Sequence, residues 1–279
     1  MADLIVTSTT NPRLKALTSL RRRRTRDETR TTVVEGHEEL ALALAGGVRP
    51  HTLFVCPELY SPAGRAGRQD IGQQDDVVGH ARQLGAEVIQ LSRAAFEKVA
   101  YRESPDGLIA VVPAVGRALA TVDPGPGALV LVSQGVEKPG NLGAMLRTAE
   151  AVGAAAVVAA DPVTDWGNPN VVRASKGTVF SVPVSAATTA ETLAWLARHS
   201  IALVVTTPDT DRLYTDVDLS GAVAVAVGAE KHGADDALLA AAAYQVRIPM
   251  LGRVNSLNVA ASAAVVVYEA LRQRSHSGR

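Results

Sequence analysis

The sequence predicts an α/β protein with two domains, and three observations carry this prediction. Short apolar segments alternate with longer helix-like segments along most of the 279 residues, which is the pattern of strands joined by crossover helices. Hydrophobic residues make up 47% of the chain, mostly Ala, Val and Leu, and aromatic residues only 4%. This composition suits helices packed on a buried sheet. A Pro- and Gly-rich stretch near residue 125 divides the alternation into two parts.

The first domain is expected to comprise residues 1–115. A polar turn at residues 9–13 leads into a helix whose apolar residues recur at Leu14, Leu17 and Leu20. Residues 61–76 are rich in Gly, Gln and Asp, which indicates a loop. Strands are expected at residues 31–36, 52–55, 87–90 and 108–112, and further helices at residues 37–45, 77–84 and 93–99.

The second domain is expected to comprise residues 127–273, after a linker at residues 116–126 that contains little to continue a strand or helix. The polar residues 274–279 are expected to form a disordered tail. Strands are expected at residues 128–132, 155–159, 201–206, 223–227 and 244–248, and helices at residues 142–152, 171–177, 189–199, 235–242 and 257–272.

Several functional classes lack their sequence signals. The single cysteine, Cys56, excludes an internal disulfide framework and fits a reducing cytoplasm. The first residues contain no apolar signal core, and no apolar run approaches the roughly 20 residues of a bilayer span. The six histidines show no metal-ligand spacing. A Walker A loop, a Gly-x-Ser-x-Gly elbow and a Gly-x-Gly-x-x-Gly turn are also missing, which argues against a conventional dinucleotide-binding enzyme. We expect a cytoplasmic protein that needs neither metal nor membrane.

Positive charge is concentrated at the start of a chain whose net charge is zero. Residues 1–30 contain eight Lys or Arg against three Asp or Glu, a local charge of +5. The run from Arg21 to Arg24 has two interpretations. It can be a solvated helix face, or it can be an arm that binds phosphates. Four consecutive arginines point around most of a helix, so they cannot all pair locally.

Three polar segments follow predicted strands of the second domain, where an open α/β sheet binds its ligands. They run from Lys138 to Arg147, from Gly228 to Gly233 and from Ile248 to Asn258. Each also has a purely structural interpretation. Asn141 and Ser256 could cap the helices that follow them, Arg147 could extend into solvent and Glu230 could simply face water. Asn258 fits a helix interior poorly, and His232 fits a loop residue better than a base.

Taken in this order, the three segments resemble the motifs of the SpoU, or TrmH, family of RNA ribose 2'-O-methyltransferases. The matches are Asn141 with Arg147, Gly228-x-Glu230-x-x-Gly233, and Ile248-Pro249-Met250 with Ser256-Leu257-Asn258-Val259. The first domain resembles the family's RNA-binding extension, which is L30e-like, at Ser8 with Asn11-Pro12-x-x-Lys15, at Val34-Glu35-Gly36 and at Gly107-Leu108-Ile109-Ala110. The resemblance implies a C-terminal α/β-knot methyltransferase domain with a deep trefoil knot, which periodicity would never suggest.

The resemblance also implies roles for individual residues, with S-adenosylmethionine as the cofactor. Arg147 would be the catalytic arginine. Because arginine stays protonated in proteins, it would grip the phosphate and stabilise the developing alkoxide rather than act as a base. The implied catalytic residues are Asn141, Arg147, Glu230, Ser256 and Asn258. The implied cofactor contacts are Thr206, Thr207, Pro208, Gly228, Ala229, Ile248, Met250, Leu257 and Asn258. The implied RNA contacts are Arg13, Lys15, Arg21, Arg22, Arg23, Arg24, Arg26, Arg173 and Lys176.

The expected function is methylation of a ribose 2'-hydroxyl in RNA. The L30e-like domain favours 23S ribosomal RNA, and a role in antibiotic resistance is compatible with that substrate. Transfer RNA is the alternative substrate, and a non-catalytic RNA-binding protein on the same scaffold is the alternative class. The second alternative predicts loss of the motif residues, yet all five catalytic candidates are present. The family also implies a homodimer, packed through the last helix and the helix of the first motif.

Overall fold

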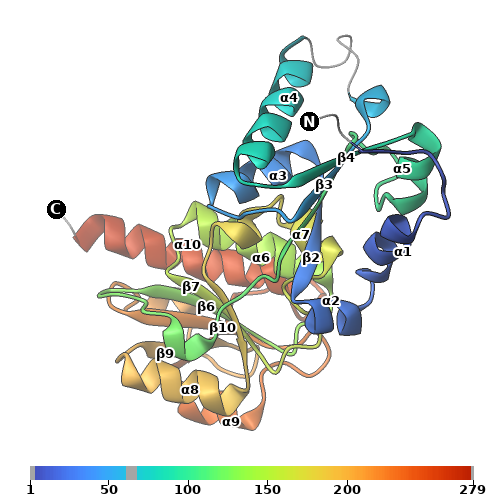
Figure 1. The fold of residues 1–279 in the computed structure, drawn as a ribbon. Helices are drawn as coiled ribbons and strands as arrows, with labels where there is room; N and C mark the ends of the chain where they lie inside the picture. Colours follow the sequence, from blue (N-terminus) through green and yellow to red (C-terminus); the bar gives the residue numbers. More distant parts are fainter. Residues whose placement is uncertain (1–3, 61–67, 278–279) are drawn as a thin grey trace. The chain divides into compact units, whose positions relative to one another are not determined.

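The chain forms two compact units, each built around its own sheet (Figure 1). The computed structural model describes residues 4–60 and 68–277. The first unit combines Met1–Val115 with Trp166–Ser181, and the second combines Gly116–Asp165 with Val182–Arg279. The predicted α/β class is confirmed, because strands and helices alternate through both units.

The first unit contains a mixed five-stranded sheet of order β1-β4-β3-β5-β2. Strands β1, β4 and β3 run parallel, whereas β5 is antiparallel to both β3 and β2. Helix α1 begins behind Asn11, whose side chain accepts a hydrogen bond from the Arg13 N–H, and it buries Leu14 and Leu17 as their spacing predicted. The elements are β1 (Leu4–Val6), α1 (Pro12–Ser19), α2 (Arg23–Thr29), β2 (Thr31–Glu35), α3 (His37–Ala45), β3 (Thr52–Val55), α4 (Arg68–Gln83), β4 (Glu87–Leu91), α5 (Arg93–Val99) and β5 (Leu108–Pro113).

Three features of the first unit differ from the sequence prediction. Helix α4 begins at Arg68, so much of the expected loop at residues 61–76 is helical; residues 61–67 lie outside the described part. Strand β1 and helix α2 were not expected, because β1 is only three residues long and α2 consists mostly of charged residues. Ion pairs one turn apart support α2, with Arg23 3.7 Å from Asp27 and Arg24 2.7 Å from Glu28.

The segment Trp166–Ser181 belongs to the first unit, although its position in the sequence suggested the second domain. It contains α7 (Pro169–Ala174) and a 3-10 turn at Thr178–Phe180. The Thr32 hydroxyl donates a hydrogen bond to the Gly167 carbonyl, and a Cβ at Gly177 would lie 3.0 Å from the Glu39 backbone. Contacts between residues so far apart in sequence leave no periodic signal.

The second unit contains a six-stranded parallel sheet of order β11-β9-β10-β6-β7-β8. Every residue of β10 is buried, which explains why this strand reads as an uninterrupted apolar run. Helices α6 and α10 contact each other, and α10 also packs on β10 (Figure 1). The elements are β6 (Leu129–Gln134), α6 (Pro139–Ala151), β7 (Ala156–Ala160), β8 (Val184–Ala187), α8 (Thr189–Arg198), β9 (Ala202–Thr206), β10 (Val223–Val227), α9 (Asp236–Ala241), β11 (Tyr244–Val246) and α10 (Val259–Ser277).

The expected linker and residues 274–277 of the expected tail are folded in the second unit. Residues 278–279 of the tail lie outside the described part. In the linker, Leu119 and Val122 are buried in the core, and the Arg117 N–H donates to the Val184 carbonyl at 2.9 Å. In the tail, α10 continues to Ser277, and the Arg274 guanidinium donates to the Gly127 carbonyl at 2.9 Å. Disorder is therefore a wrong prediction for residues 274–277, because a polar anchor rather than an apolar face holds this part of the helix.

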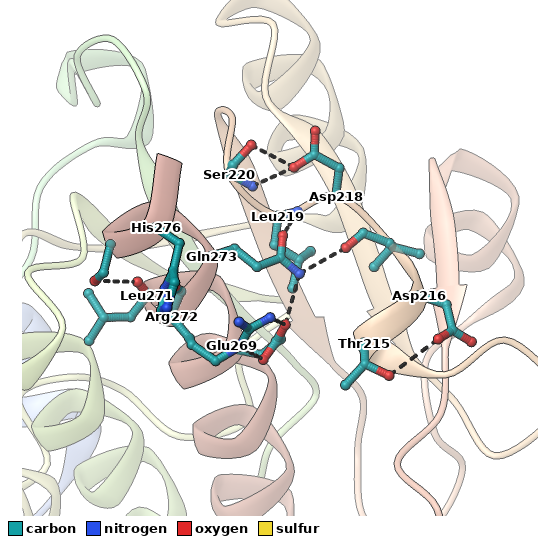
Figure 2. A network of polar contacts seen from close by, with 12 residues as sticks. Thr215, Asp216, Asp218, Leu219, Ser220, Glu269, Leu271, Arg272, Gln273 and His276 are labelled. Carbon is teal, nitrogen blue, oxygen red and sulfur yellow. Dashed lines mark hydrogen bonds and ion pairs between the residues drawn. The ribbon is translucent and has the colours of Figure 1, made fainter. Parts of the chain in front are cut away.

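Figure 2 shows how the last turns of α10 are held by the segment after Tyr214–Asp216. The Gln273 side chain accepts a 2.7 Å hydrogen bond from the Leu219 N–H and donates one of 3.0 Å to the Val217 carbonyl. Glu269 accepts two hydrogen bonds from Arg272, at 2.7 and 2.8 Å. These polar contacts fix α10 near its C-terminal end.

Candidate functional site

A cavity of about 560 Å³ lies at the carboxyl ends of β9, β10 and β11 in the second unit. An open parallel sheet places its ligand site at this edge. The cavity collects eight of the nine residues predicted to contact a cofactor, and Asn258 is the exception. The eight are Thr206, Thr207, Pro208, Gly228, Ala229, Ile248, Met250 and Leu257.

One wall of the cavity is a tight loop after β10 that carries Glu230. Ala229 and Gly233 exchange two backbone hydrogen bonds, at 3.0 and 2.9 Å, and Gly233 has a φ of +69°. A Cβ at Gly228 would lie 2.0 Å from the backbone nitrogen of Ala234. Only glycine fits such a close approach, so the tight loop predicted from the flanking glycines is present.

Three predicted catalytic side chains form a directed chain of hydrogen bonds. The Asn258 Oδ1 accepts from the backbone N–H groups of Ala260 and Ala261, at 2.9 and 3.4 Å. Its Nδ2 therefore donates to the Asn141 Oδ1, at 3.0 Å. Asn141 in turn donates through Nδ2 to a carboxylate oxygen of Glu230. Both amide groups are oriented by this arrangement, which ends on a carboxylate at the cavity wall.

The helix caps differ from the structural interpretation of the sequence. Helix α6 begins at Pro139 and its cap position is Lys138, so Asn141 lies inside the first turn, with 9% of its surface exposed. The last helix is capped by Asn258 rather than Ser256, because α10 begins at Val259. Ser256 lies in the preceding loop and lines the cavity.

Arg147 lies on α6 and is exposed to solvent. Its neighbours Met145 and Leu146 are fully buried, whereas Arg147 lies on the solvent-facing side of the helix. Within the part of the chain that the structure describes, no hydrogen bond or ion pair engages its guanidinium. The structure therefore joins Asn141, Glu230 and Asn258 but does not join Arg147 to them. A free guanidinium of this kind can grip a phosphate through two hydrogen bonds.

The basic residues of the first unit fall into distinct groups. Arg21 donates to the Ala100 carbonyl at 2.9 Å, and its guanidinium lies 4.6 Å from the centre of the Tyr101 ring. Burial raises the pKa of Tyr101 to about 12, so Arg21 stacks on a neutral ring. Arg26 is 4% exposed and donates to the Leu20 carbonyl at 2.9 Å. Against the prediction of an RNA contact, Arg26 holds the turn between α1 and α2.

Other basic residues predicted to contact RNA are exposed but have acidic or amide partners. Arg13 pairs with Glu87 at 2.7 Å and Lys176 with Glu38 at 3.7 Å, while Arg173 donates to the Asn170 side chain at 3.4 Å. Arg23 and Arg24 pair within α2. Across the described ranges, Arg22 and Lys15 are exposed and make no side-chain hydrogen bond or ion pair.

Sequence reasoning missed a polar group beside this site, in which the buried Gln134 and Thr189 are joined to the exposed Asp161. Its members come from separate strand and helix ends, so no local motif marks them. Among the described residues, no three His, Cys, Asp or Glu side chains are grouped to hold a metal ion. In the same part of the chain, no helix combines the length and apolarity needed to cross a bilayer.

Two family models match different parts of the chain. Residues 128–268 match the SpoU rRNA Methylase family, and residues 11–110 match the MRM3-like substrate binding domain. The 23S rRNA (guanosine(2553)-2'-O)-methyltransferase RlmP of Bacillus subtilis (strain 168) is 29% identical, over 94% of this chain and 97% of that protein. The 23S rRNA (guanosine-2'-O-)-methyltransferase RlmB of Ralstonia nicotianae is 31% identical, over 81% and 91%.

Solved structures agree over almost the whole chain. An RNA 2'-O ribose methyltransferase is 41% identical with a TM-score of 0.82, covering 98% of this chain and 100% of that one. The AdoMet-bound rRNA methyltransferase from Sinorhizobium meliloti is 28% identical with a TM-score of 0.86, covering 96% and 97%. With a matching family over half of its length and relatives aligned along most of it, the chain belongs to the SpoU rRNA methylase family.

Proposed function

We propose that this protein transfers a methyl group from S-adenosylmethionine to a ribose 2'-hydroxyl of 23S ribosomal RNA. The observation that carries the proposal is the hydrogen-bonded chain Asn258–Asn141–Glu230, which ends at the wall of the 560 Å³ cavity. The relatives named as 23S rRNA 2'-O-methyltransferases support the reaction and the substrate class.

The cavity fits S-adenosylmethionine in size and chemistry. Ile248, Met250 and Leu257 offer apolar contacts for the adenine ring, and Asp209 and Asp236 add negative charge opposite a cationic ligand. Gly228, which has no side chain, also lines the cavity. When bound, the cofactor supplies a methyl group that its sulfonium already activates. The protein then has to align the reacting groups rather than create a strong electrophile.

The residues around the cavity would divide the remaining work. Arg147 would bind the RNA phosphate and stabilise the negative charge that develops on the ribose oxygen. A guanidinium stays protonated in proteins, so it serves as a donor rather than a base. Glu230 uses one carboxylate oxygen to accept from Asn141, and its other oxygen would orient Arg147 or the ribose hydroxyl. Ser256, exposed at the cavity wall, would contact the same substrate.

The first unit would hold the RNA, through Arg22 and Lys15 and through the paired arginines once phosphates compete for them. Its match to a substrate binding domain supports this role, and we retain the expected L30e-like fold and the domain boundary near residue 115. The knot is part of the same proposal, because family membership supports it. A cytoplasmic location also follows from this proposal, since that is where bacterial relatives meet ribosomal RNA.

A homodimer packed through α6 and α10 is the expected assembly. Exposed apolar side chains support it, because Leu251 is 100%, Val254 65% and Tyr268 50% exposed. Such side chains, from the segment before α10 and from the helix itself, are unusual on a surface that faces only water.

The test is methyl transfer from labelled S-adenosylmethionine to separate pools of 23S, 16S and transfer RNA, followed by nucleoside mass spectrometry. A 2'-O-methylated nucleoside in 23S rRNA that is absent with Arg147→Ala would establish the reaction and its substrate. Label found in transfer RNA alone would show that transfer RNA, and not 23S rRNA, is the substrate. No label in any pool, intact ribosomal subunits included, would favour the non-catalytic RNA-binding protein.

A further inference from the structure

Gln134 is the last residue of β6, and both the Nε2 and the Oε1 of its side-chain amide make hydrogen bonds. Only 6% of its surface is exposed. Its Nε2 donates a 2.7 Å hydrogen bond to the Thr189 hydroxyl, and its Oε1 accepts one of 2.8 Å from the backbone N–H of Asp235. A buried amide with both groups satisfied is a rigid bridge between the elements it joins.

The direction of this bridge is set by Asp161. The Thr189 hydroxyl donates to the Asp161 carboxylate at 2.5 Å, and the Thr189 backbone N–H donates to the same oxygen at 3.3 Å. A hydroxyl has one proton, so Thr189 can only accept from Gln134. The amide orientation follows from these neighbours, and the acceptor end must face Asp235.

The bridge closes the loop that carries Glu230. In the sheet, Val227 of β10 lies opposite Ser133 of β6, so Gln134 lies beside Gly228, where the loop leaves the sheet. The loop ends at Asp235, whose carboxylate caps α9 by accepting from the Leu238 N–H at 2.8 Å. The loop is thus held at both ends. At its start it continues directly from β10, and at its end the Gln134 side chain of β6 binds the Asp235 backbone.

This placement links a residue outside the cavity to the cavity wall. Residues 228–234 line the cavity, and so do Asp236 and Leu239 of α9. A shift of the Asp235 backbone would move both sides of this wall and the carboxylate of Glu230 with them.

We propose that Gln134 is a positioning residue for the Glu230 loop, acting through Asp235 to shape the cofactor site without touching the cofactor. The inference rests on the proposed function only in taking S-adenosylmethionine as the ligand of the cavity. It adds Gln134, Thr189 and Asp161 to the residues on which the site depends.

Because each hydrogen bond of the Gln134 amide has a fixed direction, substitutions that change one donor or acceptor can test the bridge. Gln134→Glu keeps the shape and the acceptor for Asp235 but places a carboxylate oxygen against Thr189, whose one proton cannot serve two carboxylates. Thr189→Val removes the acceptor for Gln134, whereas Thr189→Ser keeps the hydroxyl. Leaving a buried donor or acceptor unpaired should weaken cofactor binding about tenfold.

The experiment is calorimetric titration of S-adenosylmethionine into each full-length variant well below its Tm, with thermal unfolding measured alongside. Gln273→Met is the matched control, because Gln273 also bridges backbone groups, at Leu219 and Val217, but does not line or border the cavity. Gln134→Glu and Thr189→Val should raise the Kd about tenfold. Thr189→Ser and Gln273→Met should bind like the wild type, even where the Tm of Gln273→Met falls.

The results distinguish a failure of the positioning role of Gln134 from a failure of the proposed function. Gln134→Glu and Thr189→Val proteins that bind with the wild-type Kd, whatever their Tm, would overturn the positioning role and leave the proposed function intact. A wild-type protein that does not bind S-adenosylmethionine would overturn the cofactor assignment of the cavity, and the inference with it.

Discussion

The side-chain amide of Asn258 donates a 3.0 Å hydrogen bond to the Oδ1 of Asn141, 117 residues earlier in the chain. The Asn258 Oδ1 is already committed to the first N–H groups of α10, so neither amide can turn over without breaking a contact. Asn141 must then present a donor to Glu230. The N-terminus of α10 thus determines which hydrogen-bonding group meets the Glu230 carboxylate.

Asn258→Asp should separate the capping role of Asn258 from its orienting role. The carboxylate keeps both acceptors for α10 but offers no N–H to Asn141. We expect methyl transfer to fall about 10- to 100-fold while the Tm changes little. Asn258→Ala should in addition lose about 1 kcal/mol from the missing cap. Single-turnover transfer and thermal unfolding would measure both, and a wild-type rate in Asn258→Asp would refute the orienting role.

Arg147→Ala should remove activity without affecting the fold. The side chain is exposed and makes no hydrogen bond or ion pair within the described residues, so the free energy of unfolding should change by less than about 0.5 kcal/mol. Cofactor affinity should also stay the same, because Arg147 does not line the cavity. Arg147→Lys keeps the charge but not the forked donor geometry and should recover only a small part of the rate. Full activity in Arg147→Lys would reduce the role of this residue to charge alone.

Gly228→Ala should abolish cofactor binding, because the added Cβ would lie 2.0 Å from the backbone nitrogen of Ala234. The loop would have to open, and the cavity wall with it. Gly140→Ala is the matched control, since a Cβ there meets no atom within 4 Å. Calorimetric titration should show binding by Gly140→Ala and none by Gly228→Ala. Equal affinities would show that the loop relaxes without cost to the site.

Local patterns in the sequence were sufficient to place many elements. Strand β10 was predicted with its observed bounds, because Val223–Val227 is buried throughout and bounded by turn residues. Helix α5 was also predicted with its observed bounds, Arg93–Val99, and it begins behind a capping Ser92. The motif segments fell at strand ends, but it was the family resemblance that implied the cofactor contacts, eight of which line the cavity.

Contacts between distant residues could not be predicted. Gln134 acts through Thr189 and Asp235, which lie 55 and 101 residues away, and polar pairs of this kind have no period. Arg26 shows the converse: within an arginine-rich run it looked like a phosphate ligand, yet its side chain turns inward to the Leu20 carbonyl. Composition shows how much charge a segment carries but not which side chains the backbone will bind.

Glu269→Gln should lower stability at neutral pH and have no effect in acid. The carboxylate is 8% exposed, and two hydrogen bonds from Arg272 hold the pKa of Glu269 below its usual value of 4.5 (Figure 2). A lowered pKa contributes stability above pH 4.5, which is lost as the pH falls through the folded value. Because the Arg272 side chain is 58% exposed, the loss should stay below about 1 kcal/mol.

Urea unfolding of wild type and Glu269→Gln at neutral pH and again well below pH 4.5 would check this. Glu97→Gln is the control, since Glu97 pairs with Arg93 across an exposed helix surface and should show a smaller difference. A Glu269→Gln deficit that persists unchanged in acid would mean that packing, not charge, supplies the contribution.

Arg22 and Arg26 should respond differently to replacement by alanine, although they lie in the same arginine-rich segment. Arg22 is exposed and makes no side-chain hydrogen bond or ion pair within the described residues. Arg22→Ala should therefore weaken RNA binding and reduce the slope of log Kd against log salt by about 1, with unchanged stability. Arg26→Ala should lose about 1–3 kcal/mol of stability, because two backbone carbonyls would lose their donor.

Filter binding of a 23S rRNA fragment at several salt concentrations, with urea unfolding of each variant, would separate the two effects. Lys15→Ala is the parallel variant to Arg22→Ala, because both side chains are exposed on the same unit, carry one charge and are proposed RNA contacts. If Lys15→Ala and Arg22→Ala each reduce the slope, the two side chains act as independent phosphate contacts. If neither does, the run is a solvated helix face, and the RNA must be held by the arginines that are ion-paired in the free protein.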